Sequence, residues 1–243
     1  MLPDLAREEF AVCLDEVVTG FLAETDWEQP PVDALKLAQT AGMAVAIDSR
    51  LLGRARTVRL QPGEEAQQAS IMLRPEPRAE RRQWAVAHEI GEQLAYRVFA
   101  ELGVLPAEAD VAARERVANL LASRLLLPSS WFERHAGDCH WDLFELKAIF
   151  TTASHELIAR RMLDFEPPVM VTLFDQSHVT WRKSNVPGRV PPLTPGELDC
   201  WREARETGRA VDRLQDFGNV QAWPIHEPGW QREILRTELP EDF

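Results

Sequence analysis

The sequence predicts an α+β protein with a helical core, a small antiparallel sheet and a small β-rich module at the C-terminal end. Apolar residues recur with helical spacing over much of the first 165 residues. Short β-rich runs separated by polar, Gly or Pro segments interrupt this pattern between residues 44 and 73. After Pro167-Pro168 the composition shifts towards strand-forming residues, so we expect two domains, 1–166 and 167–243.

The first elements are marked by periodicity and by chain breakers. Helical spacing runs from Leu5 to about Ala23, and Pro30-Pro31-Val32-Asp33 opens a second helix over 34–39, which Gly42 ends. Three strand-like runs follow, and we expect them to pair as the small antiparallel sheet: Ala44–Ile47, Thr57–Leu60 and Ser70–Leu73.

Longer helices are predicted from Glu80 to about Leu102 and from about Ala107 to Leu127, where Pro128 stops the second. Residues 141–165 form a pair of shorter helices, broken near 151–154, where Ser or Thr can cap the second. The stretch 146–154 is similar to a helix-turn-helix. Acidic residues outnumber basic ones over 142–164, which favours packing helices over a DNA reader.

The C-terminal module begins with a predicted hairpin, Val169–Phe174 with His178–Trp181. A helix is expected from Pro195 to Gly208, and a further strand over Val220–Trp223.

Composition excludes several classes of protein. The 243 residues, 45% hydrophobic and 27% charged, suffice for one substantial core with a small appended domain. The net charge of −12 opposes non-specific binding to nucleic acid or to an anionic membrane. No apolar run reaches 18 residues, and the first residues are acidic instead of forming a basic leader segment. The three cysteines, Cys13, Cys139 and Cys200, are odd in number and widely spaced, which fits a reducing compartment. We therefore expect a cytoplasmic protein.

The most informative motif is His88-Glu89-Ile90-Gly91-Glu92. It has the frame of the zinc-protease helix motif H-E-x-x-H, with a glutamate in place of the second histidine. In that motif the residues at i and i+4 face one metal ion, and the glutamate after the first histidine activates water. Because a carboxylate can also bind zinc, His88 and Glu92 are candidate metal ligands and Glu89 is the candidate general base.

A third ligand is expected on the next helix. Glu115 lies on a row with Val111, Ala118 and Ala122, which we interpret as core-facing. The small residues Ala118 and Ala122 would let this helix approach the first, and Asn119, one turn after Glu115, is placed to orient its carboxylate.

Other interpretations of these residues are open. His88 could be a satisfied core histidine, and Glu92 and Glu115 could pair with Arg97 or Arg124. Cys139-His140 is a second pair of metal-ligating types, but a lone Cys-His pair is more typical of a loop.

Over residues 30–165 these features together resemble the ImmA/IrrE family of metallo-endopeptidases. The resemblance rests on Pro30–Asp33 with the strands, the Arg-rich lead-in to Ala87–Gly91, and Glu115–Asn119 through Leu125–Pro128. It is fairly specific, because the two motifs come in the right order and at a plausible separation. It implies a zincin-like helical core, with His88 as first ligand, Glu89 as catalytic base and Glu115 as third ligand. Glu92 replaces the second ligand, and Tyr96 stands where the family has a later histidine.

The resemblance implies a metal-dependent endopeptidase, with zinc as the expected ion, acting on a protein partner such as a helix-turn-helix repressor. A second carboxylate adds a hard oxygen ligand to the set, so we expect the site to accept manganese or iron more readily than the standard site does. The alternative from another class is a catalytically silent pseudo-protease that recognises a partner as an antirepressor or a toxin–antitoxin component. Direct contact with nucleic acid or with a membrane is not expected.

Overall fold

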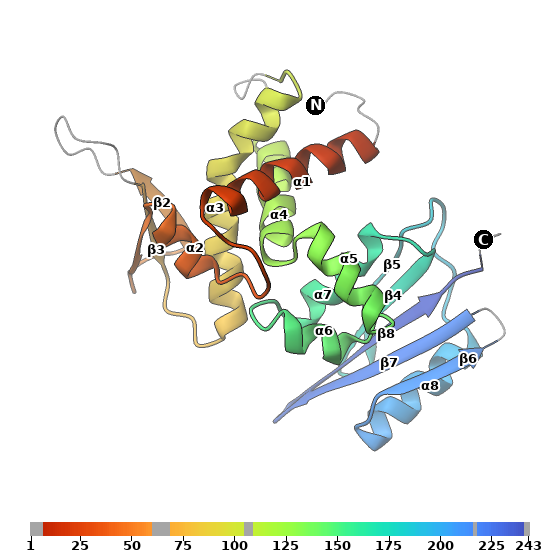
Figure 1. Cartoon of the computed structure of the whole chain (residues 1–243). Coiled ribbons are helices and arrows are strands. Elements are labelled where there is room, and N and C mark those ends of the chain that lie inside the picture. The colour runs from red at the N-terminus through yellow and green to blue at the C-terminus, as the bar shows by residue number, and fades with distance from the viewer. Residues whose placement is uncertain (1–6, 60–68, 105–108, 216–217, 241–243) are drawn as a thin grey trace, which may run out of the picture. The chain divides into compact units, whose positions relative to one another are not determined.

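The computed structural model describes residues 7–59, 69–104, 109–215 and 218–240, and the chain divides into two compact units (Figure 1). Unit 1 comprises Met1–Arg134 and Ile149–Ser154, and unit 2 comprises His135–Ala148 and His155–Phe243. The predicted α+β class, with a separate β-rich C-terminal part, is confirmed.

Unit 1 contains the predicted helices and strands of the N-terminal half. Side-chain caps fix two helix starts: Asp33 Oδ1 accepts from the backbone N–H groups of Leu35 and Lys36, and Asp110 accepts from that of Ala113. The predicted endpoints Leu5, Leu60 and Ala107 lie outside the described residues. The elements are α1 (Arg7–Glu24), α2 (Ala34–Thr40), β1 (Ala44–Ile47), β2 (Ala55–Arg59), β3 (Ala69–Leu73), α3 (Ala79–Glu101), α4 (Val111–Leu126) and α5 (Ser129–Asp138), whose last turn belongs to unit 2.

The small sheet of unit 1 is mixed, not wholly antiparallel as predicted. Its strand order is β1-β3-β2, with β2 antiparallel and β1 parallel to β3. The third strand inserts between the first two, because the chain after β1 passes to the opposite edge before it forms β2. Alternation of apolar residues marks a strand but not its direction, which is why the sequence did not reveal this pairing.

Helix α3 is the central element of unit 1. Its buried face carries the apolar row Val86, Ile90 and Leu94, each at most 3% exposed. Helix α3 also packs on α4, where Val117 and Leu121 are fully buried. The two helices thereby form the rigid support for the side chains that lie between them.

Unit 2 is built on a sheet with strand order β5-β4-β8-β7-β6, antiparallel throughout the described residues. The predicted hairpin, the predicted helix and the strand around residues 220–223 are confirmed, whereas α5, β6 and β8 were not predicted. The elements are α6 (Leu143–Ile149), α7 (His155–Arg161), the 3-10 turn η1 (Met162–Asp164), β4 (Val169–Asp175), β5 (His178–Ser184), α8 (Pro195–Thr207), β6 (Val211–Gln215), β7 (Gly218–Glu227) and β8 (Trp230–Glu238).

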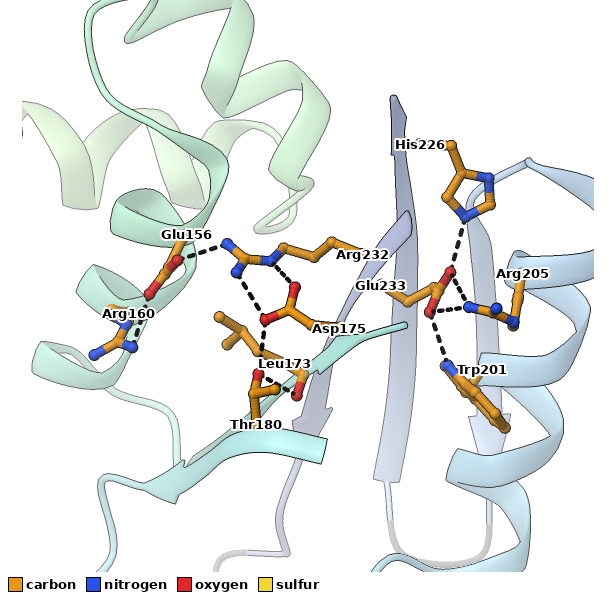
Figure 2. Close-up of polar contacts among 10 residues, drawn as sticks. All are labelled: Glu156, Arg160, Leu173, Asp175, Thr180, Trp201, Arg205, His226, Arg232 and Glu233. Atoms are coloured by element: carbon orange, nitrogen blue, oxygen red, sulfur yellow. Dashed lines mark hydrogen bonds and ion pairs between the residues drawn. The ribbon is translucent and has the colours of Figure 1, made fainter. Parts of the chain in front are cut away.

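Strand β8 connects the helices on both faces of this sheet (Figure 2). Consecutive strand residues point to opposite faces. Arg232 reaches Glu156 of α7, with Nη1 2.5 Å from Oε2, and also pairs with Asp175 of β4. The next residue, Glu233, is fully buried on the other side and accepts hydrogen bonds from Trp201 and Arg205 of α8.

The contacts divide the chain at a different place from the predicted domain boundary between residues 166 and 167. Residues 135–148 and 155–166 group with the C-terminal sheet. The indole N–H of Trp223 donates to Asp142 at 3.0 Å, and the guanidinium of Arg236 lies over the ring of Trp141, 5.2 Å from its centroid. The composition shift at Pro167 therefore marks a change of secondary structure, while helical packing partners of the sheet precede it in the chain.

Candidate metal centre

The close approach of α3 and α4 creates the candidate site. Ala118 and Ala122 are fully buried at the contact, as the sequence predicted. The residue opposite them is Gly91, where an added Cβ atom would lie 2.5 Å from the carbonyl oxygen of Ala118. Sequence reasoning missed this role of Gly91, although a glycine inside a helix is a signal of close packing.

Beside this contact between α3 and α4, the structure brings together the three predicted ligands. His88 Nε2 lies 3.6 Å from Glu92 Oε1 and 3.6 Å from Glu115 Oε2. One candidate ligand atom from each residue lies within 4.8 Å of the others, and within the described part of the chain no other group of three or more His, Cys, Asp or Glu has such geometry. The spacing predicted from two separate helices is thus realised in three dimensions.

Asn119 sets the orientation of the imidazole. Its Oδ1 lies 3.1 Å from His88 Nδ1, so it accepts a hydrogen bond when Nδ1 carries the proton. That tautomer leaves the lone pair of Nε2 pointing at the two carboxylates, as a metal-ligating histidine requires. The sequence predicted that Asn119 orients the carboxylate of Glu115. The amide instead contacts His88 on the neighbouring helix, so the predicted contact is wrong.

The site is open to solvent on its carboxylate side. The side chain of His88 is 19% exposed, whereas those of Glu92 and Glu115 are 42% and 51% exposed. The predicted core-facing row on α4 is wrong at its start, since Val111 is also exposed and burial begins only at Ala118. Sequence periodicity alone does not reveal that the first turns of α4 are exposed to solvent.

Negative charge accumulates around the imidazole. Burial raises the pKa of Glu92, and the nearby carboxylates of Glu89 and Glu115 raise it further, while His88 opposes the shift. Repulsion among carboxylates of this kind is relieved by a cation. The electrostatics of the cluster therefore favour binding of a positive ion.

Glu89 occupies a different environment from the two exposed carboxylates. It is 4% exposed, and its Oε2 accepts a hydrogen bond of 2.8 Å from the hydroxyl of Thr57 on β2. Its burial and its hydrogen bond to β2 also give Glu89 a role in packing, which the sequence did not reveal. Its Oε1 has no hydrogen bond to any residue that the structure describes, so one oxygen is held and the other can exchange a proton.

The alternative partners proposed for the carboxylates are engaged elsewhere. Arg97 forms two hydrogen bonds to Glu24, of 2.7 and 2.9 Å. Arg124 pairs with Asp15 at 3.0 Å. Neither arginine therefore neutralises Glu92 or Glu115.

Two further residues lie apart from the cluster. Tyr96, where the family has a later histidine, is 58% exposed, and its hydroxyl accepts a hydrogen bond from Arg97. Cys139 lies in a turn of unit 2, where its thiol donates to the carbonyl oxygen of Ala136, and it belongs to no metal-like cluster of the described residues.

The donor set fits a divalent ion of the first transition series. Two ligands at about 2.1 Å from one ion in tetrahedral geometry lie about 3.4 Å apart, close to the two 3.6 Å separations observed. The exposed carboxylates can rotate to close the remaining gap. Three protein ligands with an open side would leave a fourth position for water or substrate, as in catalytic zinc sites.

Comparison with solved structures identifies a neighbour of the same fold. A Mycobacterium tuberculosis transcriptional regulator is similar to this chain, with a TM-score of 0.63 and 19% sequence identity, and the match covers 95% of this chain and 80% of that one. No protein-family model matches the chain, and no curated protein does. None of the described helices is long and apolar enough to cross a membrane.

Proposed function

We propose that this chain binds one divalent metal ion through His88, Glu92 and Glu115 and is a metal-dependent endopeptidase acting on a protein partner. The observation that carries the proposal is the convergence of these three ligand atoms within 4.8 Å, beside the buried carboxylate of Glu89. The resemblance of residues 30–165 to the ImmA/IrrE family supports the same activity.

The side chains of the site have separate roles in the proposed reaction. A bound zinc ion, or manganese or iron, would supply Lewis acidity that polarises a peptide carbonyl and acidifies water. Glu89 is the group that takes up a proton at its free Oε1, since Thr57 holds Oε2. Asn119 keeps His88 in the ligating tautomer.

The proposed partner is a protein involved in transcription. A structural neighbour is named a transcriptional regulator, and the family resemblance implies a helix-turn-helix repressor as substrate. A net charge of −12 disfavours direct binding to DNA, so we place regulation at the level of the repressor.

A second function, a catalytically silent regulatory protein, is favoured by one observation. The hydrogen bond between Thr57 and Glu89 links β2 to α3, and a buried carboxylate with such a role can be retained for structure alone. In that case the metal cluster would stabilise the fold or report metal availability to a partner, without cleavage.

Cleavage profiling distinguishes the two functions. Purified protein loaded with zinc, manganese or iron is incubated with a proteome-derived peptide library, and new termini are identified by mass spectrometry. The endopeptidase predicts new termini with the wild type and none with Glu89→Gln, which retains size and metal ligands. Absence of new termini with both proteins, with metal bound, would support the silent regulator instead.

A further inference from the structure

A basic cleft lies next to the candidate metal centre in unit 1. It has a volume of about 260 Å³ and is lined by four arginines and one acidic residue: Arg54, Arg74, Arg81, Arg82 and Glu76. Residues 50–82 contain eight arginines and four glutamates, in a chain whose net charge is −12. The lining of the cleft is therefore basic, in a chain that is acidic as a whole.

Two of the cleft arginines are held by the turn that joins β3 to α3. Arg82 Nη1 donates to the backbone carbonyl oxygens of Glu76 and Pro77, at 2.7 and 3.1 Å. Arg81 Nη1 lies 3.7 Å from Glu76 Oε2. These contacts fix the guanidinium groups at the wall of the cleft.

The guanidinium groups of the other two cleft arginines remain available to bind a ligand. The side chains of Arg54 and Arg74 are exposed, and neither has an ion-pair partner among the residues that the structure describes. A backbone hydrogen bond of 2.9 Å between Arg74 N and Arg54 O keeps the two residues adjacent. A guanidinium group presents its donors in a planar fork that matches a carboxylate.

Helical spacing places residues of the cleft and of the metal cluster on one face of α3. Arg81 lies seven residues before His88, and residues at this spacing occupy the same helical face, two turns apart. Arg82 stands in the same relation to Glu89. At 1.5 Å per residue this separation is about 10 Å along the helix.

Strand β2 spans the same interval. Arg54 immediately precedes β2, and Thr57, three residues later, donates to Glu89. Three residues of extended chain cover about 10 Å. A polypeptide held at the metal cluster would therefore reach the cleft within about three residues.

We infer that the cleft binds acidic side chains of the protein partner, about three residues from the segment held at the metal cluster. The inference about position rests on the proposed function, whereas binding of acidic peptide to the cleft does not. A short acidic segment fits because its carboxylates need contact only this local patch. A nucleic acid would extend over the acidic remainder of the surface and be repelled there.

The test is a fluorescence-anisotropy titration of the full chain with a labelled eight-residue peptide that carries four Asp or Glu residues. The neutral comparison peptide has Asn and Gln at the same positions. Measurements are made with EDTA present and repeated in the Glu89→Gln background, so that binding is separated from metal and from catalysis. We expect the acidic peptide to bind at least tenfold more tightly than the neutral one.

Variants then locate the binding site. Arg54→Ala combined with Arg74→Ala should weaken binding of the acidic peptide about fivefold or more, whereas the lysine double variant, which keeps the charge but not the planar fork, should weaken it less. The matched control combines Arg189→Ala with Arg209→Ala, two exposed arginines of unit 2 with the same charge change. Equal thermal midpoints of the variants verify folding.

Three results would overturn the inference. Equal affinity for the acidic and neutral peptides would show that binding does not depend on the charge of the peptide. Equal losses of peptide affinity in the two alanine double variants would show that binding depends on the overall charge of the protein and not on the cleft. A single-stranded oligonucleotide that binds more tightly than the acidic peptide and displaces it would make the cleft a nucleic-acid surface. Retained peptide binding in a protein without metal affinity or cleavage would contradict the proposed function alone.

Discussion

Gly91 on α3 lies against Ala118 on α4 so closely that a Cβ atom at position 91 would stand 2.5 Å from the carbonyl oxygen of Ala118. Because the obstacle is backbone, it cannot move aside as a flexible side chain would. One turn before Gly91 is His88, and one turn before Ala118 is Glu115. The contact therefore sets the distance between two ligands that belong to different helices.

Gly91→Ala should separate the helices and weaken metal binding. We expect the free energy of unfolding to fall by about 1–3 kcal/mol, since overpacking outweighs the higher helix propensity of alanine. Urea unfolding and a zinc titration measure the two effects. The matched control is Gly20→Ala in α1, where an added Cβ atom meets nothing within 4 Å, and it should gain up to about 1 kcal/mol. Unchanged stability and metal affinity in Gly91→Ala would refute the close contact.

Asn119→Ala should lower metal affinity without unfolding the protein. The variant removes the hydrogen bond that holds His88 in its ligating tautomer, and loss of such a supporting contact typically costs about 10–100-fold in metal affinity. Competition with a fluorescent zinc chelator measures the change. Asn119→Asp, which keeps an acceptor at the same place, should retain most of the affinity. If alanine and aspartate behave alike, Asn119 has no positioning role.

Thr57→Val tests how Glu89 is held. The change leaves a buried carboxylate without its hydroxyl partner, which should cost about 1–3 kcal/mol of stability and reduce cleavage while leaving metal content unchanged. Thr57→Ser preserves the hydroxyl and should resemble the wild type. Loss of bound metal in the valine variant would instead show that β2 supports the ligands themselves.

Part of the proposed ligand triad could be predicted because helical spacing is local information. His88 and Glu92 must share a face at i and i+4 whatever the tertiary structure. The meeting with Glu115 depended on small residues at the helix contact, which the sequence also displays at Ala118 and Ala122. Metal binding and catalysis stay predictions.

The parts that could not be predicted depend on non-local packing. The parallel pairing of β1 with β3 depends on which edge the chain reaches after Ile47, and no local pattern records this. The contact of Thr57 with Glu89 joins residues 32 positions apart. Periodicity likewise does not reveal that Glu115 lies on an exposed turn of α4.

Acid should destabilise unit 2 through Glu197. Burial raises the pKa of this carboxyl, but hydrogen bonds from Arg182, Thr237 and the backbone N–H of Thr194 outweigh that effect and hold the pKa below its usual range. A lowered folded-state pKa contributes stability that is present above the unfolded value, about 4.3, and is lost as pH falls through the folded value.

Urea unfolding followed by tryptophan fluorescence between pH 7 and pH 3 measures this loss. Glu197→Gln should be less stable at pH 7 by about 3–5 kcal/mol, because the variant leaves Arg182 buried without its charge partner, and it should depend less on pH below 5. The control is Asp199→Asn, which breaks an exposed pair with Arg202 and should change stability by less than about 1 kcal/mol. Parallel pH profiles of wild type and Glu197→Gln would exclude Glu197 as the titrating group.

Calorimetric titration of the chelator-treated protein with zinc tests most directly whether His88, Glu92 and Glu115 hold one metal ion. The wild type should bind one equivalent, Glu92→Ala and Glu115→Ala should each bind far more weakly, and Glu92→His, which places two histidines at i and i+4, should bind at least as well as the wild type. Glu101→Ala, which removes an exposed carboxylate at the end of α3, should leave the titration unchanged. A wild type that binds no zinc, manganese or iron, or alanine variants that bind as the wild type does, would contradict the metal centre.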